Sequence, residues 1–578
     1  MAAAVNRDTQ AAGQAGQVQA AAEAVAPEVG LLPGLDPLGF GRALCDLGAA
    51  PVRNPLGMFA AVARFAADAP AATMASLART IGASPPGPVE PASRDRRFAD
   101  PAWSRNPCYY AVQQGYLLWS RLLTDLVAAS GLDERARLKA GFAVQAMIDA
   151  LAPTNTLAGN PAALRKAWQT GGVSALRGVG NLLDDVARNR GRPRQVDLSQ
   201  FRLGGNLAAT PGEVVYRNQL MELIQYAPQT ETAYEVPILC SPPWINKYYI
   251  MDLAPGRSFI EWAVQHGHTV FAISYRNPDA SMQDVALDDY LLHGPYTAVD
   301  VITEITGSER VNVVGLCLGG TLTAMLLAHM AARRDDRVRS ATLLNTLIDF
   351  SEPGPLGCFV DGPTVARVER RMARRGYLRA TELSTTFDLL RANDLIWNYV
   401  ASNWLMGERP PAFDVLAWNQ DGVRMPARMF AFYLRYCYLE NQLARGEMNL
   451  AGTRLNLDAI TEHVYLVAAK EDHIVPWASA YRSTQLLASP RRFVLTSSGH
   501  IAGIVNPPNG KGRYWTNEAL PPDPNAWLAG TAEHSDSWWD DWTTWIAERA
   551  GERRAPPSLG SDRYPALGPA PGVYVHDT

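Results

Sequence analysis

The sequence lacks the features that would place it among metal-binding, disulfide-linked or membrane-spanning proteins. Its six cysteines are scattered and include no CxxC pair, which argues against a zinc site and against a disulfide framework. No segment approaches roughly 18 uninterrupted apolar residues, so we expect no transmembrane segment. The net charge is only −4 and the pI is about 6.2, so the overall charge does not indicate nucleic-acid binding. We expect neither a metal ion nor a cofactor.

The composition is otherwise that of a large globular protein. Apolar residues make up 47% and charged residues 19% of the 578 positions, enough for about two to four domains. Residues 1–35 are rich in alanine and glutamine, and they lack the basic start and apolar core of a signal peptide. We therefore predict a disordered N-terminal tail over residues 1–35.

Helical periodicity dominates residues 36–199. Apolar residues recur at helical spacing over residues 55–67, 110–129 and 133–151, and segments rich in proline and glycine separate these stretches. The pattern predicts a helical N-terminal domain over residues 36–199, without indicating its purpose.

After residue 200 short apolar runs alternate with helical stretches. Residues 201–206 and 212–226 are predicted as strands joined by a turn at Thr210, Pro211 and Gly212. Further buried strands are predicted at residues 236–240, 269–273, 311–314, 341–344, 464–468 and 493–495. Such alternation favours an α/β domain over residues 200–578, with a mostly parallel sheet covered on both faces.

Residues 350–456 interrupt this alternation. They contain no comparable strand run and are dense in tryptophan, tyrosine and phenylalanine. We interpret them as a helical cap inserted into the α/β domain and folded over its active site. Most of the aromatic side chains are expected simply to form the core of the cap.

The most informative motif is Gly-Leu-Cys-Leu-Gly at residues 315–319. It follows a predicted buried strand and precedes a predicted helix, the arrangement of a nucleophile elbow with cysteine in place of serine. The helix N-terminus after Cys317 adds partial positive charge, which favours a thiolate. The pattern is short, and free cysteines are often merely buried, so the strand-turn-helix context carries the catalytic interpretation.

A cysteine nucleophile needs a base, and the base needs an orienting partner. Asp472 and His500 each follow a predicted strand, and active sites of open α/β sheets lie at the carboxyl ends of strands. The order Cys317, Asp472, His500 is the nucleophile–acid–base order of α/β-hydrolases. His473 is the alternative base, but adjacent residues usually point apart, so we prefer His500 and give His473 a supporting role.

The oxyanion hole requires two backbone N–H groups. Leu318, directly after the nucleophile, supplies one in the elbow arrangement. The second is expected from residues 241–249, the loop after a predicted strand, where the prolines have no N–H to give. We assign it to Ile245, with Trp244 as the alternative.

Several segments together resemble the polyhydroxyalkanoate synthases, the poly(3-hydroxyalkanoate) polymerases. These are residues 243–253, 275–282, 315–320, 418–422, 438–441, 471–477 and 498–508, and the resemblance spans residues 100–550. It implies an α/β-hydrolase fold with an inserted cap behind a helical domain. The family's catalytic cysteine, aspartate and histidine fall on Cys317, Asp472 and His500.

The resemblance also implies an activity and a setting. Members polymerise (R)-3-hydroxyacyl-CoA thioesters into a polyester and release CoA through a covalent cysteine thioester. The single-chain layout is similar to class I, which prefers short units such as 3-hydroxybutyryl-CoA. Family members work as homodimers on polyester granules in the bacterial cytoplasm, beside granule-associated proteins.

Two other functions remain open from the residues. A thioesterase or esterase uses the same elbow, although serine at position 317 would favour it more. A non-catalytic granule coat or scaffold would keep the fold, but Cys317, Asp472 and His500 are all present. We expect an acyltransferase that binds no nucleic acid and has no transmembrane segment.

Overall fold

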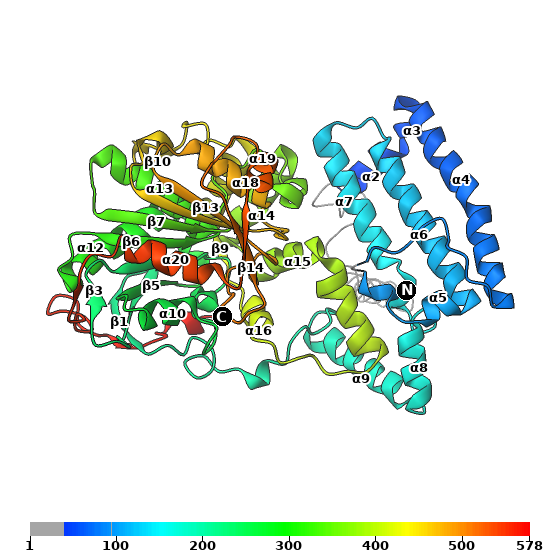
Figure 1. Ribbon diagram of the computed structural model, residues 1–578, viewed down its shortest axis with the longest axis horizontal. Coiled ribbons are helices and arrows are strands. Elements are labelled where there is room, and N and C mark those ends of the chain that lie inside the picture. Colours follow the sequence, from blue (N-terminus) through cyan, green and yellow to red (C-terminus); the bar gives the residue numbers. More distant parts are fainter. Residues whose placement is uncertain (1–39, 94) are drawn as a thin grey trace, which may run out of the picture. The chain divides into compact units, whose positions relative to one another are not determined.

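The computed structural model describes residues 40–93 and 95–578, so the predicted tail over residues 1–35 lies outside the described residues. The chain divides into two compact units (Figure 1). One holds the described residues up to Asp197 together with Thr385–Pro411, and the other holds Leu198–Ser384 and Ala412–Thr578. Over the described residues, no helix is both long and apolar enough to cross a membrane.

The first unit is helical. Its long helices begin at side-chain caps: Asn54, Asn106 and Asp133 each accept a hydrogen bond from a backbone N–H of the first turn, which satisfies donors that the helix itself leaves unpaired. The three predicted helices are confirmed. The helices of this unit are α2 (Phe40–Gly48), α3 (Ala50–Arg53), α4 (Pro55–Ala78), α5 (Ala102–Arg105), α6 (Pro107–Ala128), α7 (Glu134–Ala150), α8 (Pro161–Gln169) and α9 (Val173–Arg188).

The segment Thr385–Pro411 comes from the middle of the predicted cap but groups with the helical unit. It contains the end of α15 (Ala380–Leu390) and two π-helical stretches, η9 (Asn393–Trp397) and η10 (Val400–Leu405). Small residues of α9 allow η10 to approach closely, since a Cβ on Gly178 would lie 2.0 Å from the carbonyl oxygen of Trp404. The indole of Trp404 donates to the buried carboxylate of Asp185 at 2.8 Å.

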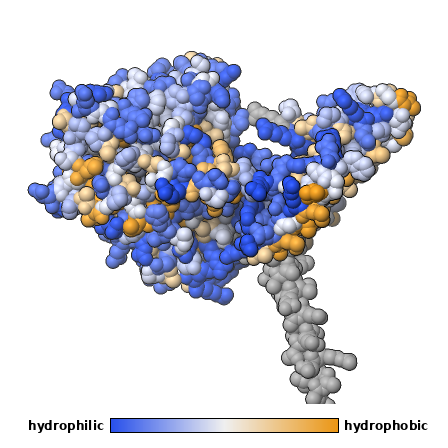
Figure 2. All heavy atoms as spheres, turned by 90° about the horizontal axis from the view of Figure 1, so that it is seen from below, coloured by the Kyte–Doolittle hydropathy of each residue, from blue (hydrophilic) through white to orange (hydrophobic). Residues whose placement is uncertain are grey.

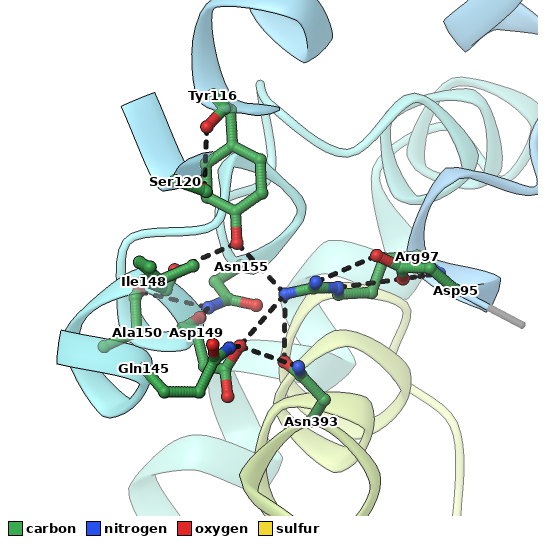
Figure 3. Close-up of polar contacts among 10 residues, drawn as sticks. All are labelled: Asp95, Arg97, Tyr116, Ser120, Gln145, Ile148, Asp149, Ala150, Asn155 and Asn393. Atoms are coloured by element: carbon green, nitrogen blue, oxygen red, sulfur yellow. Dashed lines mark hydrogen bonds and ion pairs between the residues drawn. The ribbon is translucent and has the colours of Figure 1, made fainter. Parts of the chain in front are cut away.

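A polar cluster around Arg97 joins this segment to the rest of the unit (Figure 3). The Arg97 guanidinium donates to Asp95 at 2.9 Å, to Tyr116 Oη at 3.1 Å and to Asn393 Oδ1 at 3.0 Å. The amide of Asn393 donates to Asp149 Oδ1 at 2.7 Å. Burial raises the pKa of Asp149, while Asn393 and Arg97 hold it down, so the cluster stabilises a charge that would otherwise be costly.

Arg97 should therefore be required for the stability of the helical unit. Arg97→Met leaves Asp149 buried without its cation, and we expect a loss of about 3 kcal/mol in the free energy of unfolding. Arg391→Met is the matched control, because Arg391 forms an exposed pair with Asp394 within one turn and should contribute less than about 1 kcal/mol. Scanning calorimetry of both variants measures the difference. Equal effects would contradict the role of the Arg97 cluster.

The second unit is built on an eleven-stranded sheet in the order β15-β14-β13-β12-β7-β6-β4-β5-β2-β1-β17. The six strands from β13 to β5 run parallel, and antiparallel strands extend both edges. The bounds are β1 (Gly212–Arg217), β2 (Met221–Tyr226), β4 (Ile238–Ser241), β5 (Val270–Tyr275), β6 (Val311–Leu316), β7 (Val338–Leu344), β12 (His463–Ala469), β13 (Arg491–Thr496), β14 (Arg513–Thr516), β15 (Ala532–Ser535) and β17 (Gly568–Pro569).

One predicted strand is wrong. Residues 201–206 form a compact turn in which Gly204 has a φ of +71° and only an isolated bridge joins Leu203 to Leu207. The side chain of Asn206 accepts from the Arg202 N–H at 2.7 Å and closes the turn. Local side-chain hydrogen bonding thus replaces strand pairing here. The predicted strand over residues 212–226 is in fact two antiparallel strands, β1 and β2, and the remaining predicted strands of the sheet are confirmed.

Helices cover both faces of the sheet, as predicted. On one face α10 (Phe259–Gln265) and α20 (Trp538–Ala547) pack through aromatic rings, and the Phe259 centroid lies 4.6 Å from that of Trp542. α13 (Leu318–Arg333) is buried from Leu318 to Met330. Outside the predicted cap, the other helices of the sheet unit are α11 (Leu287–Leu291), α12 (Thr297–Thr306), α18 (Trp477–Arg482) and α19 (Pro524–Ala529).

The parts of the predicted cap that belong to the sheet unit are mainly helical. They comprise α14 (Gly362–Arg375), the start of α15, α16 (Asp414–Gln420), α17 (Ala427–Phe432) and the π-helical stretch η11 (Tyr433–Leu439). The strands described there, β8 (Tyr377–Leu378), β9 (Met425–Pro426), β10 (Asn449–Leu450) and β11 (Thr453–Arg454), have two residues each and lie outside the main sheet.

The helical unit exposes large apolar side chains, and Figure 2 shows them as orange patches on its surface. On α9 they form a stripe at helical spacing, and Leu176 and Leu183 are 74% and 63% exposed. The opposite side of α9 carries Ser174, Gly178 and Asp185, which are buried. This helix therefore turns its apolar face outward. An exposed apolar stripe of this kind is typical of a contact surface.

Candidate active site

The turn between β6 and α13 carries Cys317 in a strained backbone conformation. Its φ and ψ are 52° and −115°, outside the regions that L-residues ordinarily occupy. Such a conformation costs on the order of 1–3 kcal/mol and persists only where the surrounding packing enforces it. The Cys317 N–H donates to the carbonyl of Leu344 on the neighbouring strand β7 at 2.8 Å, and the residue is partly exposed. The strand, turn and helix have the predicted elbow arrangement.

Glycines on both sides of Cys317 permit this turn. A Cβ on Gly319 would lie 2.0 Å from the carbonyl oxygen of Ser241, at the end of β4. A Cβ on Gly315 would lie 2.6 Å from Cα of Gly320. Both separations are far below van der Waals contact, so only glycine fits, and the first turn of α13 lies directly against the loop after β4.

The loops after β12 and β13 bring Asp472 and His500 together. Nδ1 of His500 lies 2.6 Å from Oδ2 of Asp472. The other carboxylate oxygen accepts from the backbone N–H groups of Ile474 at 2.8 Å and Val475 at 2.9 Å. The side chains of Asp472 and His500 are 0% and 7% exposed. His500 also interacts with the side chain of Cys317, so the structure brings all three predicted residues together.

The pKa of His500 is raised from its ordinary 6.5 to about 10. Burial by itself lowers this pKa, but the charges of Asp472 and Cys317 and their hydrogen bonds outweigh it. The site therefore favours a protonated His500 held beside Asp472 and Cys317. The interactions of protonated His500 therefore add to the free energy of unfolding. Their contribution is complete below about pH 6.5 and is lost as the pH rises through about 10.

His473, the alternative base, follows Asp472 in the same loop and is partly buried. The carboxylate of Asp472 makes its short contact with His500, which favours His500 as the base. His463 is the first residue of β12, at the end of that strand away from Asp472, and His329 is buried on α13. Neither is placed to act at this site.

Asn345 is a site residue that the sequence analysis missed. It directly follows β7 with a φ of +43°, and it is fully buried. Its side-chain amide donates to the carbonyl of His500 at 2.5 Å, and its Oδ1 accepts from the N–H of Ala469 at 2.9 Å. Asn345 thus holds the ends of three neighbouring strands together beneath the site. The available signal was an asparagine at the carboxyl end of a predicted parallel strand.

The two predicted oxyanion donors lie in the segments expected for them. Leu318 is the first residue of α13, where backbone N–H groups have no acceptor within the helix. Ile245 lies in the loop after β4, whose last residue, Ser241, pairs with Gly315 in the sheet. The carbonyl of Ile245 accepts from the N–H of Val423 at 2.8 Å, which fixes the loop to the cap.

Aromatic side chains of the cap lie close to Cys317. The ring centroid of Tyr438 lies 5.4 Å from that of Tyr433 and 4.9 Å from that of Phe350. Burial raises the pKa of the Tyr438 phenol, and the nearby Cys317 raises it further. Both tyrosines come from η11, so this part of the cap lies close to Cys317. A buried aromatic environment of this kind limits access of water.

The sequence is similar to known proteins over most of its length. A family model described as the N-terminus of poly-beta-hydroxybutyrate polymerase (PhaC) matches residues 94–263, and one for the alpha/beta hydrolase fold matches residues 256–507. The poly(3-hydroxyalkanoate) polymerase subunit PhaC of Cupriavidus necator is 46% identical over 83% of each chain. The poly(3-hydroxyalkanoate) polymerase of Methylorubrum extorquens is 44% identical, covering 86% of this chain and 84% of its own.

The chain belongs to the poly(3-hydroxyalkanoate) polymerase family. The α/β-hydrolase fold of its sheet unit agrees with the second family model. Among solved structures, DcsB in complex with its substrate analogue covers 59% of this chain at 13% identity with a TM-score of 0.33, a likeness too weak to add detail.

The charge pairing in the polymerase site predicts a pH-dependent thiol reactivity. Asp472→Asn removes the carboxylate that raises the pKa of His500, so His500 loses its proton at lower pH and the positive charge beside Cys317 is reduced at pH 7. We expect alkylation of Cys317 by iodoacetamide at pH 7 to slow by about tenfold or more, and the rate to recover at higher pH.

Glu471→Gln is the matched control, since Glu471 is the exposed neighbour of Asp472 and lies outside the His500 pair. Mass spectrometry of the Cys317 peptide measures the rate against pH. An Asp472→Asn profile that coincides with that of the parent would contradict the assigned pairing.

Proposed function

We propose that this polymerase converts (R)-3-hydroxyacyl-CoA thioesters into polyester through a covalent thioester on Cys317. The observation that carries the proposal is the assembly of a strained, partly exposed cysteine with a buried Asp472–His500 pair, in a chain of the polymerase family. Short units such as 3-hydroxybutyryl-CoA are the proposed substrates, as the class I-like layout implies.

In the acylation step, His500 holds the proton taken from Cys317, and the thiolate attacks the thioester carbonyl of the substrate. Backbone N–H groups of Leu318 and Ile245 stabilise the oxyanion. Collapse of the tetrahedral intermediate breaks the carbon–sulfur bond to CoA, and the imidazolium of His500 gives its proton to the departing thiolate. The products are CoA and an acyl thioester on Cys317.

In the transfer step, His500 accepts the proton of a 3-hydroxyl group, and the resulting oxygen nucleophile attacks a Cys317 thioester. An oxoester forms, Cys317 leaves as a thiolate, and His500 remains protonated beside it. The reaction runs downhill because a thioester becomes an oxoester. Asp472 orients His500 in this proposal, since it is fully buried and its oxygens already accept two N–H hydrogen bonds besides the His500 contact.

Transfer to a hydroxyl competes with hydrolysis of the Cys317 thioester. The aromatic cluster of Phe350, Tyr433 and Tyr438 supports a water-poor site, because these rings pack together close to the nucleophile. Exclusion of water is what separates a polymerase from a thioesterase with the same elbow.

The function is tested with purified protein and (R)-3-hydroxybutyryl-CoA. We expect CoA release, followed with a thiol reagent, together with a product of high mass. Cys317→Ala should abolish release without unfolding the protein, whereas Cys108→Ala, at an exposed cysteine of α6, should leave it unchanged. Undiminished release by Cys317→Ala, or release of free 3-hydroxybutyrate alone, would contradict the proposal.

We further propose that the enzyme works as a homodimer on polyester granules in the bacterial cytoplasm, and that the outward stripe of α9 contacts the apolar surface. Support comes from the exposure of Leu176, Val179, Leu183 and Val186 on that helix.

Leu176→Lys combined with Leu183→Lys should lower the fraction of the enzyme that sediments with amorphous polyester by about tenfold. CoA release from dissolved substrate should be unchanged.

Thr303→Lys, on α12 of the sheet unit, is the control for added charge, because Thr303 is partly exposed. Equal sedimentation of the stripe variant and this control would contradict a role for α9. Analytical ultracentrifugation of the dissolved enzyme measures whether it is a dimer.

A further inference from the structure

The last residues of the chain are built into the sheet unit. Carboxylate Oε2 of Glu222, a fully buried residue of β2, accepts from the N–H groups of Val573 and Tyr574, each at 2.9 Å. The Tyr574 hydroxyl donates to the carbonyl of Asn218 at 2.7 Å, and Val575 is 1% exposed. Hydrogen bonds and burial therefore hold residues 573–578, here called the C-terminal strut, in a defined position on the sheet unit.

Lys247 connects the strut to the loop after β4. Its side chain is buried, and Nζ donates to the carbonyl of Asp577 and, at 3.4 Å, to that of Tyr574. Burial lowers the pKa of Lys247, while the carboxylates of Asp421 and Asp577 oppose that effect. A buried ammonium is retained only where its hydrogen bonds are satisfied, and here the strut supplies the acceptors.

The same loop contains Ile245, the proposed oxyanion donor, and it is held to the cap by its backbone. The carbonyl of Lys247 accepts from the indole N–H of Trp418 at 2.8 Å, and the carbonyl of Ile245 accepts from Val423 at 2.8 Å. The amide of Asn246 donates to the carbonyl of Asn419 at 3.2 Å. The loop therefore lies between the cap on one side and the strut on the other.

Asn277 and Arg424 also contact the strut. The Asn277 amide donates to the carbonyl of Asp577 at 3.3 Å, and its oxygen accepts from the Arg424 N–H at 2.9 Å. The Arg424 guanidinium donates to a main-chain oxygen of Thr578 at 2.7 Å. The strut thus reaches both the oxyanion loop, through Lys247, and the cap segment that holds this loop, through Arg424.

We propose that Lys247 and the C-terminal strut are positioning elements for the oxyanion hole. By fixing the loop between the cap and the strut, they set the distance of the Ile245 N–H from the carbonyl attacked by Cys317. The inference rests on the proposed function, since it concerns the same acylation step. Lys247 acts through the loop and does not itself touch the reacting atoms.

The first test is a chain that ends at Val573. Misplacing one oxyanion donor costs up to about a hundredfold in rate, so we expect kcat for CoA release to fall about 10- to 100-fold while KM changes less than about threefold. Iodoacetamide alkylation of Cys317 should keep its parent rate and pH profile, because the Asp472–His500 pair is untouched. Added peptide Tyr-Val-His-Asp-Thr should restore kcat in a saturable way, and a scrambled peptide should not.

Point variants separate positioning from folding. Val575→Asp should release the strut from the sheet unit and reproduce the loss of kcat. Lys247→Met should also lower kcat, but the added peptide should not restore it. His576→Ala is the matched control, because the His576 side chain is exposed, and it should keep full activity. Thermal denaturation of each variant reports whether the fold is intact.

Two results would overturn the inference: unchanged kcat in the truncated chain, or equal loss of kcat and of Cys317 alkylation without rescue by peptide. The second would indicate a general contribution to folding. Failure of the proposed function is distinct, because then the intact chain itself would release no CoA from (R)-3-hydroxybutyryl-CoA.

Discussion

Close packing around the turn at Cys317 is the constraint on which the site depends. The left-handed φ of Cys317 costs free energy, and the sheet maintains it because β4 and β7 lie against both sides of the turn. Gly319 brings the helix within contact of the Ser241 carbonyl, and this contact places the start of α13 beside the loop that carries Ile245. One steric requirement therefore orients Cys317 and brings together the two segments proposed to bind the oxyanion.

Buried polar groups set the rest of the geometry. The carboxylate of Asp472 is withdrawn from water, so its backbone and histidine contacts have to compensate for lost solvation, and they also fix the direction of His500. Asn345 fixes the main chain in a similar way, since its buried amide hydrogen-bonds to Ala469 and to the carbonyl of His500 and so joins both to the end of β7. Such fully satisfied networks rigidify a site more than apolar packing alone does.

The sequence predicted the parts of this protein that follow local rules. The buried runs became central strands because parallel strands covered on both faces must be apolar, and Cys317, Asp472 and His500 follow strands at one edge of the sheet. The turn at residues 201–206 was missed because Asn206 and Gly204 act through local hydrogen bonding. Asn345 and Lys247 were missed because their partners, His500 and Asp577, lie more than a hundred residues away in the chain.

The grouping of Thr385–Pro411 with the helical unit could not be predicted either. The spacing of apolar residues indicates where helices form, but not which other helices they pack against. This grouping changes how the cap is connected. The chain passes between the units after Asp197, after Ser384 and after Pro411, so the cap segments on either side of the excursion are tethered to the helical unit. The Arg97–Asp149–Asn393 cluster holds that excursion through buried charge. Local sequence patterns cannot show this grouping, because the contacts of Asn393 with Arg97 and Asp149 join residues that lie more than two hundred positions apart in the chain.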